Sequence, residues 1–175
     1  MEKYYFSYKE IHKIIQQKAK DIIRTGFVPD YILAIGGGGF IPARILRTFI
    51  DKPVISISLS RYTAEGVAVD KPIKQQWIDK IHVDLNKKKI LLVDEVDDCR
   101  TTLEYCIKEL FKSYDMELSV FVLHNKLKEK HGKIPKGVKH FFIGKDIEDK
   151  WINYPWDALD ITAHEQLASN KGKNS

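Results

Sequence analysis

Residues 89–103, with the sequence KILLVDEVDDCRTTL, constrain this chain more than any other segment. The apolar run Ile90 to Val93 has the composition of a buried strand, and a helical pattern begins at Leu103. Between them lie four carboxylates, Asp94, Glu95, Asp97 and Asp98. Like charges repel and carboxylates resist desolvation, so packing alone does not explain such a turn. The pattern predicts a strand, a ligand-binding turn and a helix in direct succession.

The chemistry of this turn favours a ligand that carries both hydroxyl and phosphate groups. Carboxylates accept hydrogen bonds from sugar hydroxyls, and a helix N-terminus binds phosphate through its N–H groups and dipole. Thr101 and Thr102 add hydroxyl donors, so we infer a phosphorylated ribose. The alternative is that Asp94 and Asp98 are only helix caps with solvated neighbours, Asp98 being placed just before the helix.

The composition is that of an ordinary globular protein with a sizeable core. The 175 residues are 43% hydrophobic and 30% charged, which fits one domain. No run approaches the roughly 20 apolar residues that span a bilayer, and the N-terminus lacks the apolar core of a signal peptide. Cys99 and Cys106 offer neither a disulfide framework nor a CxxC metal pair, so we expect a cytoplasmic protein with no membrane partner. The net charge of +5 comes with scattered lysines, so we expect a solvated surface and no nucleic-acid partner.

Hydrophobic periodicity and turn residues predict alternating helices and strands. Ser7 and Glu10 form a capping-box pattern ahead of a helix over residues 8–25. Further helices are predicted over 43–50 and 101–113, and further strands over 31–35, 54–59, 77–83, 118–124 and 139–143. Residues 60–76 and 126–136 are predicted to be loops, and residues 169–175 a disordered tail. The alternation implies an α/β fold, a single domain over residues 1–168 with a mainly parallel twisted sheet flanked by helices.

A run of four glycines, Gly36 to Gly39, follows one of the predicted strands directly. Without β-carbons, the backbone amides there can approach a polyanion closely. The spacing is neither GxGxxG nor that of a P-loop, so neither a dinucleotide site nor a Walker site is supported. Ligands of such folds bind beyond the carboxyl ends of strands, where both this run and the acidic turn fall. A flexible tight turn is the alternative interpretation.

Three further features have both a functional and a structural interpretation. Lys126 follows a predicted strand and is either a ligand contact or a solvated loop residue. Trp151 and Trp156 either form a lid over a ligand or pack into the core. The aromatic residues Tyr4 to Phe6 indicate an exposed interface, so a homo-oligomer, a dimer or a tetramer, is expected.

Taken together, these motifs resemble those of the type I phosphoribosyltransferases. KILLVDEVDDCRTTL resembles the family's phosphoribosyl-pyrophosphate motif, and AIGGGGFIPARIL is similar to its pyrophosphate loop, where a cis peptide is frequent. DKWINYPWDAL is similar to the purine-binding tail of the xanthine-guanine and hypoxanthine-guanine members. The resemblance covers almost the whole chain and points to the fungal-type hypoxanthine-guanine branch. It implies the type I phosphoribosyltransferase fold with a small C-terminal base-binding hood near residues 144–165.

The resemblance also implies a role for each motif residue. Asp98 is the implied catalytic acid/base facing N7 of the purine, and magnesium is the implied cofactor. Lys126 would donate to the purine O6, Trp151 would stack on the base, and Ile152 would offer its carbonyl to a 2-amino group. The implied groups are Asp94 and Glu95 for the ribose; Asp98, Cys99, Arg100, Thr101 and Thr102 for the 5′-phosphate; Gly36, Gly37 and Gly38 for pyrophosphate; Lys126, Trp151, Ile152 and Asp157 for the purine; and Asp94, Glu95 and Asp157 for magnesium.

The implied function is a purine salvage enzyme that transfers 5-phosphoribose from phosphoribosyl pyrophosphate to N9 of hypoxanthine, guanine or xanthine. The alternatives are a non-catalytic regulator that binds the same donor, and a phosphoribosyltransferase for another base. Gly37 departs from the family because many members have Lys or Arg there. Cys99 and Arg100 replace the family's Thr-Gly pair, so Arg100 either contacts the phosphate or restricts the loop. Asp97 has no implied role.

Overall fold

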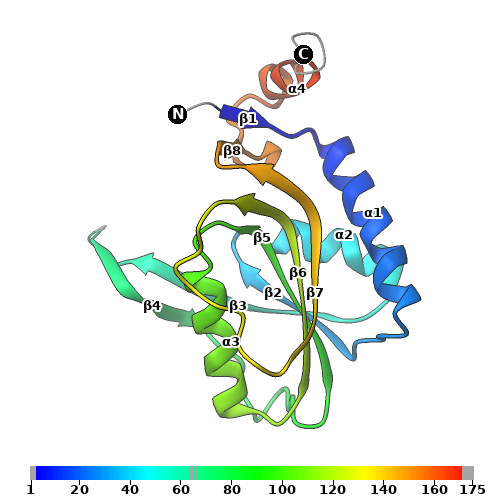
Figure 1. Cartoon of the computed structure of the whole chain (residues 1–175), viewed down its shortest axis with the longest axis vertical. Coiled ribbons are helices and arrows are strands. Elements are labelled where there is room, and N and C mark those ends of the chain that lie inside the picture. The colour runs from blue at the N-terminus through cyan, green and yellow to red at the C-terminus, as the bar shows by residue number, and fades with distance from the viewer. Residues whose placement is uncertain (1–2, 64, 66, 171–175) are drawn as a thin grey trace.

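The structure, a computed structural model, describes residues 3–63, 65 and 67–170. Its centre is a six-stranded sheet with the order β4-β3-β2-β5-β6-β7 (Figure 1). The strands are β2 (Tyr31–Gly36), β3 (Val54–Tyr62), β4 (Ala68–Gln76), β5 (Lys89–Asp97), β6 (Glu117–Leu127) and β7 (Val138–Glu148). β4 pairs antiparallel with β3, and the remaining neighbours pair in parallel. The predicted α/β fold with a mainly parallel sheet is confirmed.

Helices cover both faces of this sheet because its central strands are apolar on both sides. α1 (Tyr8–Arg24) and α2 (Phe40–Ile50) pack on one face, and α3 (Thr101–Ser113) packs on the other (Figure 1). Along β2, Ile32 and Ala34 enter the first core while Leu33 and Ile35 enter the second, as the alternation of side chains along a strand requires.

The predicted capping box starts α1. Ser7 Oγ accepts from the Glu10 N–H at 3.1 Å, and Glu10 Oε2 accepts from the Ser7 N–H at 2.8 Å. α3 spans the residues predicted for it, whereas α2 begins at Phe40, before the predicted start at residue 43. Pro42 therefore lies in the first turn of α2, where its missing N–H is not needed.

A small hood lies beyond the carboxyl end of the sheet and joins both ends of the described chain (Figure 1). β1 (Lys3–Tyr5) pairs in parallel with β8 (Trp151–Asn153), and η1 (Pro155–Asp157) and α4 (Ile161–Ser169) follow. His164 Nε2 lies 2.8 Å from the carbonyl oxygen of Phe6, which ties α4 to the N-terminal segment. The hood therefore begins after β7, not at residue 144, and includes N-terminal residues that the sequence did not assign to it.

Residues 60–76 are not the long loop that the sequence predicts. Residues 60–62 complete β3 and residues 68–76 form β4, and the two strands pair at one edge of the sheet, while residues 64 and 66 of the predicted loop lie outside the described residues. Pro72 favoured a loop, but β4 is an edge strand, where proline is tolerated.

Three other predicted boundaries are wrong. Residues 77–83 form turns and no strand, because the Asp79 side chain accepts from the Ile81 N–H at 2.9 Å and bends the chain locally. Lys126 belongs to β6 and not to a loop. Ser169 ends α4, so the tail predicted from residue 169 starts inside a helix, and residues 171–175 lie outside the described residues.

Tyr4 to Phe6 do not form the exposed aromatic surface that the sequence suggests. The pairing of β1 with β8 covers them, so that Phe6 is fully buried and Tyr4 and Tyr5 are half-buried. The Phe6 ring stacks on His124 of β6 with centroids 3.9 Å apart. These residues join the hood to the sheet.

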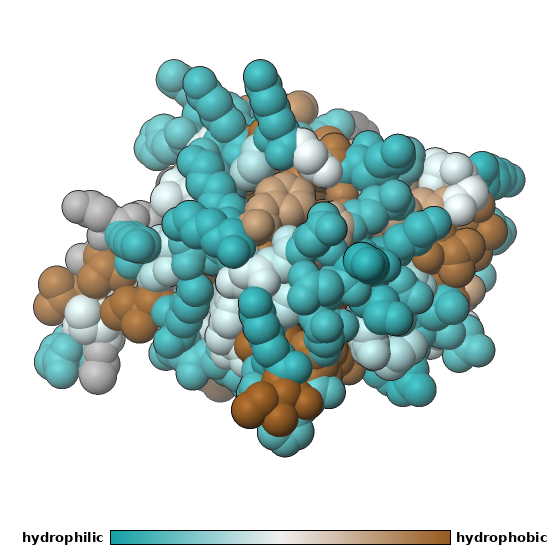
Figure 2. Space-filling model, turned by 90° about the horizontal axis from the view of Figure 1, so that it is seen from below, coloured by the Kyte–Doolittle hydropathy of each residue, from teal (hydrophilic) through white to brown (hydrophobic). Residues whose placement is uncertain are grey.

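The surface seen from below is mostly hydrophilic, with hydrophobic residues in separate groups (Figure 2). Within the part of the chain that the structure describes, every helix is too short or too polar to cross a membrane.

Candidate active site

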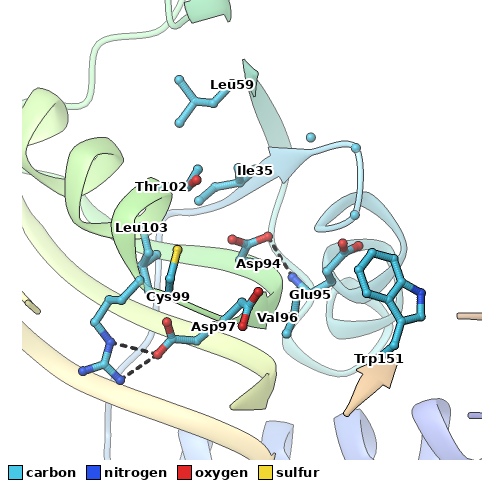
Figure 3. A pocket seen from close by; sticks show the side chains of 15 residues that line it. Ile35, Leu59, Asp94, Glu95, Val96, Asp97, Cys99, Thr102, Leu103 and Trp151 are labelled. Atoms are coloured by element: carbon cyan, nitrogen blue, oxygen red, sulfur yellow. Dashed lines mark hydrogen bonds and ion pairs between the residues drawn. The ribbon is translucent and has the colours of Figure 1, made fainter. Parts of the chain in front are cut away.

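A cavity of about 530 Å³ lies between the carboxyl ends of β2 and β5 (Figure 3). From β2 the chain continues to β3 on one side, while β5 lies on the other side, so the strand order reverses here. Such a switch point is where open α/β sheets bind ligands. The cavity is lined by Ile35, Gly36, Gly37, Gly38, Leu59, Asp94, Glu95, Val96, Asp97, Asp98, Cys99, Arg100, Thr102, Leu103 and Trp151. The structure thus brings the glycine run, the acidic turn and Trp151 together.

The glycine run forms one wall of the cavity, and the Gly36–Gly37 peptide is cis. A β-carbon on Gly38 would occupy the space of the Glu95 carboxylate. A β-carbon on Gly39 would lie 2.6 Å from the Val93 carbonyl oxygen. At Gly37 a β-carbon would meet nothing within 4 Å. Close packing against backbone therefore requires glycine at position 39, and at position 38 a side chain would displace the Glu95 carboxylate, which the alternative of a merely flexible turn does not explain.

Burial and neighbouring negative charges disfavour the ionised forms of the two carboxylates at the end of β5, Asp94 and Glu95. Burial is the main cause that raises the pKa of Asp94 well above its usual value, and the neighbouring charges of Glu95 and Asp97 add to it. Burial, followed by the charge of Asp157, raises the pKa of Glu95 to about 7. Hydroxyl donors or a cation bound here would favour the ionised forms.

The described residues contain no group of three or more His, Cys, Asp or Glu side chains arranged to hold a metal ion. Glu95 Oε2 is nevertheless buried and has no hydrogen-bond partner among the described residues. Magnesium keeps several waters and is commonly bound through one or two carboxylates plus substrate phosphates. The pair Asp94 and Glu95 fits an ion of that kind, one that arrives with a phosphate ligand.

Asp98 lies within a group of alternating charges at the end of β6. Lys128 Nζ is 2.9 Å from Asp98 Oδ1, and Lys126 Nζ is 3.4 Å from the same oxygen. Both lysines also contact Asp149, at 3.4 Å and 3.2 Å. Partial burial raises the pKa of Asp98, but the hydrogen bond from Lys128 and the charge of Lys126 outweigh burial and lower it. Asp98 is therefore ionised, and Lys126 is not the solvated loop residue of the alternative interpretation, since it is only 7% exposed.

A second cavity of about 210 Å³ lies beside the first, below the hood. Its lining contains the residues predicted for purine binding, Lys126, Trp151, Ile152 and Asp157, together with Glu95, Val96, Asp98 and Tyr154. The side chain of Trp151 is 58% exposed and is therefore not core packing. An exposed indole beside a buried ammonium group forms a site for a flat ring that carries hydrogen-bond acceptors.

The turn between β5 and α3 presents the start of a helix to the first cavity. Arg100 is the N-cap of α3, and no side chain caps the helix. The alternative that Asp98 is an N-cap is therefore wrong. The first N–H groups of a helix have no partner within it, and here they are available for an anion. Thr102 lines the cavity, while the Cys99 thiol donates to Thr101 Oγ1 at 3.3 Å.

Sequence reasoning missed the residues that surround the predicted site. No motif singles out Lys128 or Asp149, although the lysines at 126, 128 and 130 alternate along the chain and so share a direction. Tyr154 has no role implied by the motifs, yet it lines the second cavity.

The fold and the site define an α/β protein in which an acidic turn, a glycine run and a helix start surround one cavity, with a second cavity beside it. The chain matches the phosphoribosyl transferase domain over residues 7–160. It belongs to the phosphoribosyltransferase family, as the motifs predicted.

Named phosphoribosyltransferases from two fungi are similar to this chain over nearly its whole length. The chain is 43% identical to the hypoxanthine-guanine phosphoribosyltransferase of Schizosaccharomyces pombe, over 96% of this chain and 95% of the relative. It is 40% identical to xanthine phosphoribosyltransferase 1 of Saccharomyces cerevisiae, over 98% of this chain and 97% of the relative. The predicted resemblance to the fungal-type branch is confirmed.

Solved structures share the architecture. A hypothetical protein from Neisseria gonorrhoeae with bound ppGpp is 46% identical, with a TM-score of 0.86 and coverage of 96% of each chain. A purine phosphoribosyltransferase from Pyrococcus horikoshii is 27% identical, with a TM-score of 0.71 and coverage of 91% of this chain and 97% of that one.

Proposed function

We propose that this protein is a purine salvage enzyme that transfers 5-phosphoribose from phosphoribosyl pyrophosphate to N9 of a 6-oxopurine. The bond between C1 of the ribose and the pyrophosphate oxygen breaks, the bond to N9 forms, and pyrophosphate leaves. One observation carries this proposal: Glu95, Asp98 and Trp151 line both cavities. A donor in the larger cavity and a base in the smaller one would therefore meet beside Asp98.

In this proposal Asp98 takes the proton from N7 as N9 attacks. The lowered pKa of Asp98 keeps the carboxylate ionised before the base arrives. Backbone amides of Gly36, Gly37 and Gly38 bind the pyrophosphate, where negative charge develops. The backbone of residues 98–102 and the hydroxyls of Thr101 and Thr102 bind the 5′-phosphate at the start of α3.

Asp94 and Glu95 would hold the ribose hydroxyls, and with Asp157 beside Glu95 they would contact a magnesium ion that the donor phosphates and water mainly coordinate. When bound, magnesium neutralises charge on the pyrophosphate. The unpartnered Glu95 oxygen supports this role. We expect donor turnover to cease in excess chelator and to return when magnesium is restored.

The choice of base rests on Lys126. Its ammonium group has three donors and no acceptor, so it satisfies the carbonyl at position 6 of hypoxanthine, guanine or xanthine. Adenine has an amine at that position, which would leave buried donors unpaired at a cost of roughly 1–3 kcal/mol. Trp151 does not discriminate between these bases because both rings stack, and the Ile152 carbonyl would read an amine at position 2.

A base panel tests the function. Hypoxanthine, guanine, xanthine, adenine and a pyrimidine are each supplied with phosphoribosyl pyrophosphate and magnesium, and pyrophosphate release is measured. We expect turnover with at least one 6-oxopurine and a catalytic efficiency with adenine that is lower by about 10⁴. Equal efficiency with adenine would refute the role of Lys126. Donor binding without turnover on any base would favour a non-catalytic regulator.

The relative from Neisseria gonorrhoeae, with its bound ppGpp, favours a second ligand. We infer that ppGpp, a guanine nucleotide with additional phosphates, also binds this protein, because the paired cavities offer sites for its ring and its phosphates. We expect it to compete with phosphoribosyl pyrophosphate. Inhibition that excess donor does not relieve would place ppGpp elsewhere.

We also propose a cytoplasmic homo-oligomer. Support comes from exposed apolar side chains on and before α4, with Leu159 fully exposed and Leu167 48% exposed. Sedimentation equilibrium tests the oligomeric state, and a monomer at micromolar concentration would refute it.

A further inference from the structure

The loop between β6 and β7 supports the phosphate-binding turn from behind. Lys130 Nζ donates to the carbonyl oxygens of Asp97 and Asp98, at 2.6 Å and 2.9 Å. The N–H groups of His131 and Gly132 both donate to the Cys99 carbonyl at 3.1 Å. One neighbouring loop therefore holds the carbonyls of three successive residues, Asp97, Asp98 and Cys99.

The Arg100 side chain is engaged within the protein. Its Nε and Nη2 donate to Asp97 Oδ2 at 2.9 Å and 2.6 Å, as the dashed lines at Asp97 show in Figure 3. The Asp97 side chain is fully buried, and the Arg100 side chain is only 20% exposed. On its other side the guanidinium lies 5.3 Å from the centroid of the Phe141 ring. Breaking a buried pair by removing one partner leaves an uncompensated charge, so Arg100 is not readily released to a ligand.

The backbone of Arg100 has a conformation that this residue type rarely adopts. Its φ is 66°, in the left-handed region. Glycine adopts that region readily, whereas a residue with a β-carbon is strained there. Gly132 lies against the same backbone, where a β-carbon would approach the Arg100 carbonyl oxygen to 2.6 Å. The turn therefore holds a conformation suited to glycine with an arginine, and the Asp97 pair and the neighbouring loop surround it.

We propose that Asp97, Arg100 and Lys130 form a brace that holds the phosphate-binding turn in the conformation that the donor requires. Arg100 is then a positioning residue and not a phosphate ligand, and Asp97 is its counter-ion and not a ribose ligand. The proposal rests on the proposed function, because it assumes that the turn binds the 5′-phosphate.

The test is a cycle of Asp97→Asn, Arg100→Gly and the double variant, with KM measured separately for donor and base. Asp97→Asn leaves Arg100 in the left-handed region without its buried counter-ion, and Arg100→Gly leaves the buried Asp97 carboxylate without its arginine. We therefore expect each single variant to raise the donor KM about tenfold. The base KM should change less than twofold. In the double variant the buried carboxylate and its arginine are both removed and glycine adopts the conformation unaided, so the donor KM should return to within threefold of wild type.

Competing roles give different results. If Arg100 bound the phosphate, Asp97→Asn would free it and leave or improve donor affinity, and the double variant would stay as weak as Arg100→Gly. If Asp97 bound the ribose, the double variant would stay as weak as Asp97→Asn. Either result would overturn the brace. Should one single variant fail to fold, the other single variant and the double variant decide together, since the brace requires a raised donor KM in the first and a near-normal donor KM in the second.

Arg47→Ala is the matched control, because Arg47 is an exposed arginine on α2. Calorimetric titration with phosphoribosyl pyrophosphate and magnesium accompanies the kinetics. A wild-type protein that binds donor without turnover would refute the proposed function but leave the brace testable by affinity. A wild-type protein that does not bind donor would refute both.

Discussion

The Tyr154 hydroxyl lies 2.8 Å from Nδ1 of His124 and donates to the Glu95 carbonyl oxygen at 3.3 Å. His124 is on β6, Glu95 is on β5, and Tyr154 follows β8, so this hydroxyl ties the hood to two strands of the sheet. Burial, then the charges of Glu95 and Asp94, raises the pKa of Tyr154 well above its usual value, so the hydroxyl keeps its proton. The ring also stacks on Trp156 with centroids 4.5 Å apart. Tyr154 therefore fixes the height of the hood above the acidic turn.

Tyr154→Phe should loosen the base cavity while sparing the donor cavity. The ring stacking remains, but His124 and the Glu95 carbonyl lose a buried partner, at a cost of roughly 1–3 kcal/mol in the free energy of unfolding. We expect the base KM to rise more than the donor KM. Denaturant unfolding and initial rates measure both effects, with Tyr31→Phe at the far end of the sheet as control. Loss of stability with both KM values unchanged would mean that the hydroxyl has only a structural role.

Asp98→Asn should reduce turnover by about 10² to 10⁴, the usual contribution of a positioned general base. The amide keeps the size of the carboxylate, so donor affinity should fall much less. Single-turnover rates and donor titrations separate the two quantities. Turnover near the wild-type value would show that Asp98 only pairs with the lysines.

Lys128→Ala should move the acidic limb of the pH–rate profile. The hydrogen bond from Lys128 lowers the pKa of Asp98, so its removal raises that pKa. A general base works when deprotonated, so the limb should shift to higher pH, and activity should fall at acidic pH and persist near pH 8. The profile of kcat/KM between about pH 4 and 8 measures this, with the exposed Lys136→Ala as control. An unmoved limb, or one moved to lower pH, would contradict it.

Gly37→Lys should fold and bind the donor more tightly, because a β-carbon there meets nothing within 4 Å and an ammonium group can reach the pyrophosphate. Gly39→Ala is the matched contrast. Its β-carbon would press on the carbonyl oxygens of Ile35 and Val93, at 2.5 Å and 2.6 Å, and overpacking typically costs about 1–3 kcal/mol. Thermal unfolding and donor titration test both variants. A Gly37→Lys protein with weakened donor binding would show that the position must stay small.

Elements with strong local signals could be predicted from the sequence. α3 has the predicted bounds, and the Ser7 capping box starts α1 as expected, because each depends on residues that are neighbours in the chain. β1 has only three residues, and its stability comes from Trp151–Asn153 at the other end of the chain, so no local pattern reveals it. Phe6 was predicted to be exposed for the same reason, because the residues that bury it, such as His124, are distant in the sequence.

The same distinction between local signals and contacts distant in the sequence applies to the candidate site. The motif residues Asp94, Glu95, Asp98 and the glycines form one cavity, because parallel strands bring their carboxyl ends to one edge. The lysines that contact these motif residues could not be predicted in this way. Lys128 reaches Asp98, and Lys130 reaches the carbonyls of the turn, only through the path of the β6–β7 loop, which the sequence does not specify.

Because β1 pairs with β8, the hood above the base cavity depends on residues from both ends of the chain. The glycine run and the acidic turn leave the ribosome before residue 103, whereas the first strand of the chain must wait for Trp151–Asn153 before it gains its partner. Domains fold as units while the chain is made at about 5–20 residues per second. Because the domain folds as a unit, the base cavity closes only after Trp151–Asn153 has been made, and a chain truncated before Trp151 would lack the means to accept a purine.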